Sequence, residues 1–314
     1  MIDSLVNGVD SFFVWLNSAL KQNLADYIDL ETAQEEYTLV AKDGSLLSII
    51  RIDGYRSLID NKAYYKKISS PVTSGLDPFF TKSGHAMQIW FSVDPRKSER
   101  IVKEALSPSY ETIKRLNLDL EEILDERVKN ISSLANYEEC YIVLYTTPAA
   151  LVKHEIKQEI ADKKKMRMNM KAPLKYSQDP FAGNGLLQNT HSAYVEKIYE
   201  MLASNAGIAC EKLSVYEAAR EIRRSIDDEY TANDWLPSLP GDPIAPSVRK
   251  DLHKAEEWDI VWPKLNWQVA PRDAEIIDNK LVRIGEKIYC PGYIDLMPKE
   301  IFPFSALFNS IGKK

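Results

Sequence analysis

The residues that most often carry out catalysis or bind metals are scattered along this 314-residue sequence. Its histidines share no metal-ligand spacing, and His154-Glu155 lacks the second histidine of an HExxH zinc site because Gln158 stands in that place. No GxSxG motif occurs, and no cysteine has a histidine nearby in sequence. We therefore expect no catalytic residue and no metal ligand in this chain.

Phosphate-binding loops are also missing from the sequence. The only Gly-Lys pair is Gly312-Lys313, and Leu307 stands where a GxxxxGK[ST] loop needs its first glycine. Gly183-Asn184-Gly185 matches half of a GxGxxG pattern, but Gln188 replaces the third glycine and no strand precedes it. We expect no cofactor in this chain.

Composition indicates an ordinary globular protein with an acidic balance. The net charge of −6 does not attract nucleic acid or anionic lipid overall, so such contacts would need a local patch. Cys140, Cys210 and Cys290 are far apart, which predicts a reducing compartment and buried thiols. No apolar run approaches the ~20 residues that cross a bilayer, and no secretory signal is present. These features predict a cytoplasmic protein without direct membrane insertion.

The hydrophobic patterns predict an α+β fold with a mixed, largely antiparallel sheet. Residues 37–54 form a hairpin around Asp43-Gly44, a dipeptide typical of tight turns. Further strands are expected at 86–93, 140–146 and 207–213, with the second of these central. Helices flank them, including 214–229 with a capping box from Ser214 to Glu217. A β-meander is expected at 275–290.

The first thirty residues are expected to form a separate amphipathic helix. Apolar residues recur at three- and four-residue steps, and the polar side lacks the basic face that favours anionic lipid. Such a helix packs on its own domain or docks into a partner, with direct membrane binding the third alternative. We expect partner contacts from its stripe, which contains Leu5, Val9, Phe12, Phe13 and Leu16.

Two segments of the remaining domain, residues 31–314, depart from regular patterns. A loop excursion is expected at about 147–190, with a basic run and interleaved methionines, and a Pro/Trp-rich segment at about 235–272. The basic run is a solvated loop, a protein or acidic-lipid patch, or a nucleic-acid contact; it lacks interleaved aromatic residues for stacking on bases. An acidic cluster at 119–126 is most simply a solvated helix face. Partner contacts are expected at Lys163, Lys164, Lys165, Arg167, Trp258 and Trp262.

Four segments in order resemble the N-terminal region of the VirB-type ATPases of type IV secretion and conjugation. They are AKDGSLLSIIRIDG, QIWFSVDPR, GIACEKLSVYEAAREIRRSID and RIGEKIYCPGYIDLMPKEIFPFSAL. The resemblance spans most of the chain and is strongest to the ATPase of the Dot/Icm secretion system. It implies that the chain is an N-terminal part that precedes a RecA-like motor, to which ATP and magnesium would belong.

The resemblance implies a docking and oligomerisation domain that holds the motor at the cytoplasmic face of the inner membrane. Its partners would be other subunits of the secretion complex, inner-membrane complex proteins and copies of itself. Two alternatives stay open: a stand-alone enzyme with a composite site, and a nucleic-acid-binding module that uses Lys163–Lys175.

Overall fold

The computed structural model describes residues 23–55, 65–81, 83–168, 175–183, 185–227, 232–243, 262–277 and 281–292. The chain divides into two compact units, Met1–Pro271 and Arg272–Lys314. The N-terminal stripe and Trp258 lie outside the described residues.

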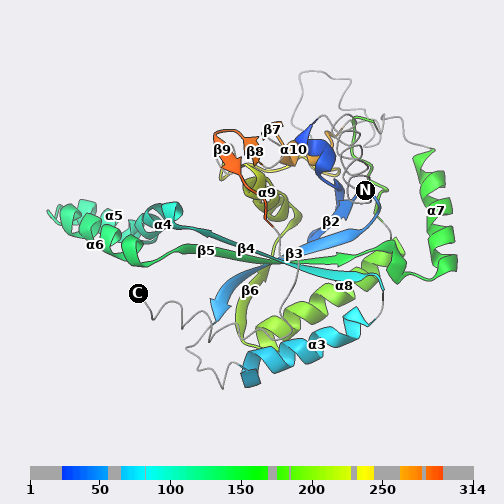
Figure 1. The fold of residues 1–314 in the computed structure, drawn as a ribbon, viewed down its shortest axis with the longest axis horizontal. Helices are drawn as coiled ribbons and strands as arrows, with labels where there is room; N and C mark the ends of the chain where they lie inside the picture. Colours follow the sequence, from blue (N-terminus) through cyan, green and yellow to red (C-terminus); the bar gives the residue numbers. More distant parts are fainter. Residues whose placement is uncertain are drawn as a thin grey trace, which may run out of the picture. The chain divides into compact units, whose positions relative to one another are not determined.

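The first unit is built on a six-stranded antiparallel sheet (Figure 1). Its strands follow the spatial order β1-β2-β3-β5-β4, and β6 pairs with the second half of the long strand β3. This arrangement confirms the α+β prediction and the central position of the strand at 140–146. The strands are β1 (Leu30–Glu35), β2 (Thr38–Ala41), β3 (Leu46–Tyr55), β4 (His85–Asp94), β5 (Tyr137–Thr146) and β6 (Ile208–Lys212).

The predicted hairpin is confirmed by the pairing of β2 with β3, in which Val40 lies opposite Leu46. Gly44 adopts a φ of 84° in the turn, a conformation that glycine reaches without a steric penalty. The carboxylate of Asp43 accepts hydrogen bonds from the backbone N–H and the hydroxyl of Ser45, each at 2.8 Å. Both residues of the Asp-Gly pair therefore stabilise the turn.

Helices cover both faces of the sheet (Figure 1). One face packs against α9 (Val215–Ile226) and α10 (Leu265–Val269) through a core that includes Leu47, Ala219 and Leu265. The other packs against α8 (Gly185–Glu200) and α3 (Ser70–Phe80). Short helical turns flank these helices: η1 (Leu24–Tyr27) before β1, η2 (Tyr65–Ser69) before α3 and η5 (Met201–Asn205) after α8.

The predicted capping box begins α9: the Ser214 hydroxyl accepts the Glu217 N–H at 3.3 Å, and the Glu217 carboxylate accepts the Ser214 N–H at 3.0 Å. These bonds satisfy donors at the start of the helix. Helix α8 begins six residues before the predicted start at His191, because Leu187 already packs in the core.

A three-helix insertion, called the helical arm below, connects β4 to β5. It contains α4 (Ser98–Ala105), α5 (Ser107–Leu116) and α6 (Glu121–Leu134), after the short turn η3 (Pro95–Lys97). The carboxylate of Asp94 accepts the backbone N–H of Arg96 and so caps the start of η3. Figure 1 shows the arm at the end of the β4–β5 ribbon.

The expected loop excursion at 147–190 contains more order than an exposed loop. After η4 (Pro148–Ala150), helix α7 spans Lys153–Arg167. Ser177, Gln178 and Asp179 are buried, which corrects the expectation that this stretch is exposed. The burial is possible because Gln178 hydrogen-bonds its amide to three other segments, through Thr32, Ser238 and Pro263.

The prediction of buried thiols is wrong for Cys290, which is exposed, while Cys140 and Cys210 are half-buried in the sheet. The strand pattern around Cys290 ends at Tyr289, so the thiol lies just beyond the meander. None of the described helices combines the length and apolar character that crossing a bilayer requires.

The second unit contains the predicted meander. Strands β7 (Ala274–Ile277), β8 (Leu281–Ile284) and β9 (Lys287–Tyr289) form an antiparallel sheet in that order. Arg283 on β8 pairs with Glu275 on β7 at 3.0 Å.

Candidate functional site

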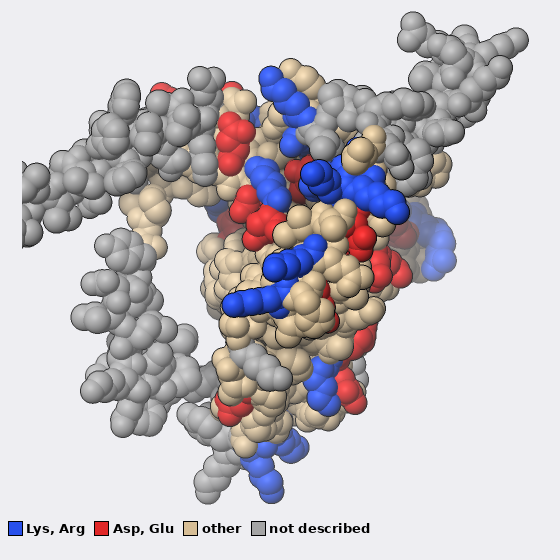
Figure 2. Space-filling model, turned by 90° about the vertical axis from the view of Figure 1, so that its right-hand side faces the viewer, with Lys and Arg blue, Asp and Glu red and all other residues tan. Residues whose placement is uncertain are grey.

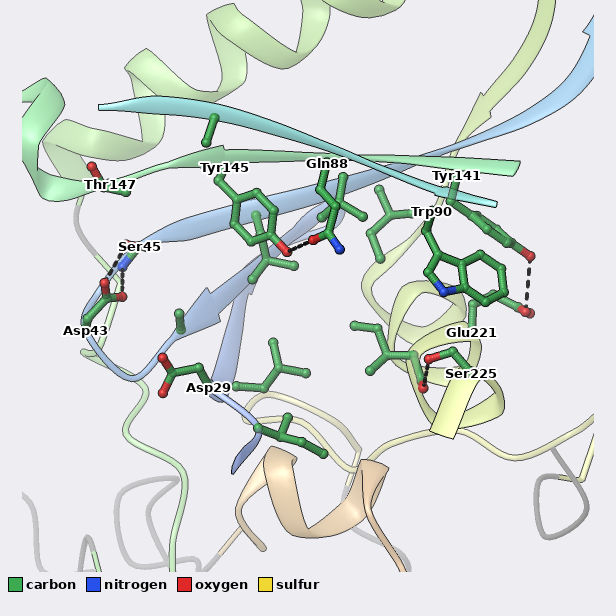
Figure 3. Close-up of a pocket in the computed structure, with 18 residues that line it drawn as sticks. Asp29, Asp43, Ser45, Gln88, Trp90, Tyr141, Tyr145, Thr147, Glu221 and Ser225 are labelled. Atoms are coloured by element: carbon green, nitrogen blue, oxygen red, sulfur yellow. Dashed lines mark hydrogen bonds between the residues drawn. The ribbon is translucent and has the colours of Figure 1, made fainter. Parts of the chain in front are cut away.

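A groove of about 480 Å³ lies on the sheet face that carries α9 (Figure 3). Its floor is the central strands, one wall is the C-terminal half of α9, and the chain just before β1 forms part of the rim. We call it the sheet groove. Its lining is mainly apolar and aromatic: Ile28, Asp29, Leu30, Ala41, Asp43, Ser45, Leu47, Ile49, Ala86, Gln88, Trp90, Tyr141, Val143, Tyr145, Thr147, Glu221, Ile222 and Ser225.

One end of the sheet groove is aromatic. Trp90 on β4 and Tyr141 on β5 are opposite each other in the strand pairing, and their rings lie 5.4 Å apart. The Tyr141 hydroxyl donates to Glu221 at 3.3 Å, and burial together with that carboxylate raises the pKa of the phenol. Glu221 is itself paired with Arg224 at 2.9 Å. This end therefore presents two flat aromatic rings, and the hydroxyl of Tyr141 is already engaged with Glu221.

The middle and far end of the sheet groove are more polar. Tyr145 donates its hydroxyl to Gln88 at 3.1 Å across the floor, and burial raises the pKa of Tyr145. Figure 3 shows Asp29 and Asp43 at the opposite end from Trp90. Among the described residues, neither carboxylate has an ion-pair partner. This end of the groove is consequently negative.

The composition of the lining decides which ligands suit the sheet groove. It contains no lysine, arginine or histidine, so a phosphate or nucleotide would meet carboxylates without a compensating cation. Aromatic rings and carboxylates without an ion-pair partner among the described residues instead favour a segment that combines apolar side chains with a positive charge. The lining of the groove is thus suited to a protein segment.

A buried histidine supplies the only other arrangement in the described residues that looks catalytic. Ser48 Oγ lies 2.9 Å from Nε2 of His191, at the wall of a smaller cavity of about 270 Å³. A nucleophilic serine must give its proton to the ring. Here the hydroxyl of Ser48 donates to the backbone oxygen of Tyr37 at 2.5 Å. His191 Nε2 must therefore be the donor to Ser48, and the pair is not arranged as nucleophile and base.

Two of the predicted partner-binding residues on α7 are engaged within the chain. The ammonium group of Lys163 donates to the backbone oxygen of Ala182 at 2.5 Å, and its partial burial lowers its pKa. Arg167 forms an ion pair with the buried carboxylate of Asp179. These two contacts attach the inner face of α7 to the segment that precedes α8.

Lys164 and Lys165 lie on the exposed side of the same helix. Neither has an ion-pair partner among the described residues. Figure 2 looks onto the side of the molecule that carries α7 and shows projecting basic side chains there, with acidic side chains beside them. The predicted basic run is thus divided into two kinds of residue. Lys163 and Arg167 hold the helix to the rest of the chain, and Lys164 and Lys165 are exposed.

Trp262 is half-buried, and its backbone contacts the segment that precedes α8. Its N–H donates to the Ser177 hydroxyl at 3.3 Å, and its carbonyl accepts the Gln178 N–H at 2.8 Å. The structure therefore brings Trp262 near the end of the basic run, but does not bring it to the sheet groove.

Sequence reasoning missed Trp90, Tyr141 and Tyr145 as candidate site residues. The signal was the alternation of side chains within two predicted strands. It places residues 86, 88 and 90 on one face of the first strand, and residues 141, 143 and 145 on one face of the second strand. What the alternation lacks is the register that aligns the two sets.

Among the described residues, no group of three or more His, Cys, Asp or Glu side chains could hold a metal ion. No protein-family model matches the chain, and no curated protein matches it.

Proposed function

We propose that the chain is a docking and oligomerisation domain of a VirB-type type IV secretion ATPase, most similar to that of the Dot/Icm system. In this role it holds a RecA-like motor at the cytoplasmic face of the inner membrane, and ATP and magnesium belong to that motor. The order of the four resembling segments supports the family, and the character of the sheet groove supports docking.

The observation that carries the proposal is that the sheet groove opens beside an unpaired strand edge. Among the described strands, β4 is the last in the sheet order and pairs with β5 alone. Gln88 and Trp90 of this strand line the groove. An extended segment of a partner can add to such an edge through backbone hydrogen bonds and place alternate side chains in the adjoining groove.

The lining specifies the chemistry of such a segment. Apolar side chains would cover Trp90 and Tyr141, and a lysine or arginine would lie toward Asp29 and Asp43. Natural edge strands are commonly protected by lysine or proline, whereas β4 has neither between His85 and Asp94. This absence fits a strand that another protein covers.

The test captures partners from cells that contain the secretion system, using the tagged chain and two matched variants. Gln88→Trp fills the sheet groove from β4. Ile89→Trp adds the same side chain at a neighbouring exposed position that does not line the groove. We expect secretion-complex proteins to co-purify with the unaltered chain and with Ile89→Trp, and to be lost with Gln88→Trp.

A second capture uses a chain that lacks residues 1–24, which separates the contribution of the predicted N-terminal helix from that of the groove. Capture of the same proteins by both tryptophan variants would contradict docking through the groove. Hydrolysis of ATP at a useful rate by the purified chain would contradict the non-catalytic role.

A further inference from the structure

The helical arm ends in an apolar patch at the turn between α5 and α6. Its four side chains, Leu116, Leu118, Leu120 and Ile123, are 41% to 61% exposed. The inner side of the arm packs through other residues, because Ile113 and Val128 are buried. Large apolar side chains that are exposed together within eight residues of the chain are typical of interaction surfaces. We call these four residues the tip patch.

Negative charge surrounds the tip patch. The stretch Asn117–Glu126 contains five acidic side chains and no basic one. Asp125 accepts a hydrogen bond from Tyr110 at 2.7 Å and lies 3.8 Å from Lys103, so it is engaged within the arm. Glu121 and Glu122 are exposed, and neither has an ion-pair partner among the described residues.

The outer face of α7 has the opposite character. Ile160, Lys164 and Met168 follow one another at four-residue steps and so lie on one stripe. Ile160 and Met168 are 62% and 79% exposed. The helix carries six basic and three acidic side chains, a formal charge of +3. Its exposed stripe therefore combines two apolar side chains with a lysine between them.

The two surfaces cannot meet within one chain. The arm precedes β5 and α7 follows it, so they lie at opposite ends of this ten-residue strand. Such a strand spans roughly 33 Å. Each surface carries exposed apolar side chains, and their charges are of opposite sign.

We propose that copies of this chain associate head to tail, with the tip patch of one copy bound to the outer face of α7 of the next. The leucines would pack against Ile160 and Met168, while Glu121 and Glu122 would face Lys164 and Lys165. Exposed leucines at the centre and charges at the margin match the usual composition of protein interfaces.

This inference rests on the proposed oligomerisation role and specifies its contact. A head-to-tail contact is heterologous, so repeated copies form a closed ring or an open filament according to the rotation between neighbours. The sheet groove stays available to other proteins, because neither surface contributes a residue to it.

The experiment measures self-association of the full chain by sedimentation equilibrium at about 50 mM and about 500 mM NaCl. The tip reversal is Glu121→Lys with Glu122→Lys, and the α7 reversal is Lys164→Glu with Lys165→Glu. We expect the unaltered chain to associate, and more weakly at high salt. Each reversal should weaken association by about tenfold or more, because like charges then face each other.

Mixing the two reversed variants gives the decisive result. Each variant repels itself, but its tip is complementary to the α7 face of the other variant, so the mixture should associate again, with copies of the two variants in alternation. Reversal of the exposed Lys66 and Lys67 to glutamate changes the net charge as the α7 reversal does and should leave association unchanged. Thermal unfolding of every variant checks that the charges do not alter the fold.

A chain that stays monomeric at about 100 µM in low salt would overturn the proposal. Association that only one of the two reversals weakens, or a mixture that stays monomeric, would overturn it as well. Such results would leave partner capture through the sheet groove intact, so the failure of this contact is distinguishable from the failure of the docking role.

Discussion

Ser48 and His191 are joined by a hydrogen bond of 2.9 Å at the interface between β3 and α8. Because Ser48 donates its hydroxyl proton to Tyr37, Nε2 of His191 carries the ring proton and Nδ1 accepts. Thr146 lies 2.9 Å from Nδ1 and donates to it, and His85 Nδ1 lies 3.1 Å from the same hydroxyl and supplies a proton to it. Every donor in this series of hydrogen bonds has an acceptor. The cluster therefore stabilises the fold while the imidazole rings of His85 and His191 are both neutral.

The neutral ring predicts a loss of stability in mild acid. Burial, with a smaller contribution from His85, lowers the pKa of His191 from 6.5 to about 4. The unfolded chain therefore binds a proton at higher pH than the folded chain, and stability is complete above about pH 6.5 and falls as the pH drops toward 4. The slope from this group is at most about 1.4 kcal/mol per pH unit.

Urea unfolding at several pH values between 7.5 and 4 measures this dependence. His191→Gln keeps one donor and one acceptor but does not titrate, so it should lower the stability at pH 7.5 and flatten the slope below 6.5. His154→Gln on the exposed side of α7 should leave the slope unchanged. An equal slope in the His191 variant would show that other groups cause the acid sensitivity.

Local patterns were sufficient for five of the six strands of the main sheet, whereas β1 was not predicted. Alternating apolar residues and the Asp43-Gly44 turn predict them because a hairpin depends on neighbouring residues alone. Helix α3 was not predicted: Pro71 lies in its first turn, where proline is tolerated, but Pro78 lies inside it, where proline ordinarily ends a helix. It forms because Leu76 and its neighbours Val72 and Phe79 pack on the core beneath α8.

The sheet groove could not be predicted because it depends on contacts between distant segments. Trp90 and Tyr141 are brought together by strand pairing across the helical arm. The burial of Gln178 was equally hidden, because a polar loop residue is ordinarily exposed and its partner Thr32 is 146 residues away. Sequence periodicity carries no information on such pairings.

Gln178 should be among the most sensitive polar residues of the first unit. Its amide accepts from Thr32 at 2.9 Å and donates to the carbonyls of Ser238 and Pro263 at 2.7 and 2.8 Å. Gln178→Ala leaves the buried hydroxyl of Thr32 without its acceptor, removes one of the two donors to each carbonyl and opens a cavity, so we expect a loss of about 2–4 kcal/mol in the free energy of unfolding.

Gln268 offers a matched control because it donates to the same two carbonyls, at 3.0 and 2.7 Å, from the solvent side. Water can replace its amide, so Gln268→Ala should cost about 1 kcal/mol or less. Urea unfolding measures both variants. Similar losses would mean that burial of Gln178 adds nothing to its hydrogen bonds.

Gly84 should tolerate no side chain at the start of β4. Its φ is 110°, and a Cβ atom would lie 2.5 Å from the backbone nitrogen of Ala150. Gly54 has a similar φ of 117° but has open space around it. Gly54→Ala therefore carries conformational strain alone, of about 1–3 kcal/mol. Gly84→Ala adds the steric clash with Ala150, so it should lower the free energy of unfolding in urea by more than Gly54→Ala does. Equal losses of stability would show that the backbone at Ala150 moves aside without an energetic cost.

Lys163 should stabilise α7 against local unfolding, whereas Lys164, the next residue, should not. Lys163→Met keeps the aliphatic stem but removes the 2.5 Å bond to Ala182, whereas Lys164→Met alters an exposed side chain. Losing one partly buried, charged hydrogen bond costs about 1–2 kcal/mol, so amide exchange across α7 should accelerate by about tenfold in the first variant. Exchange in the Lys164 variant should match that of the unaltered chain. Equal protection of α7 in both variants would mean that the ion pair between Arg167 and Asp179 holds the helix without Lys163.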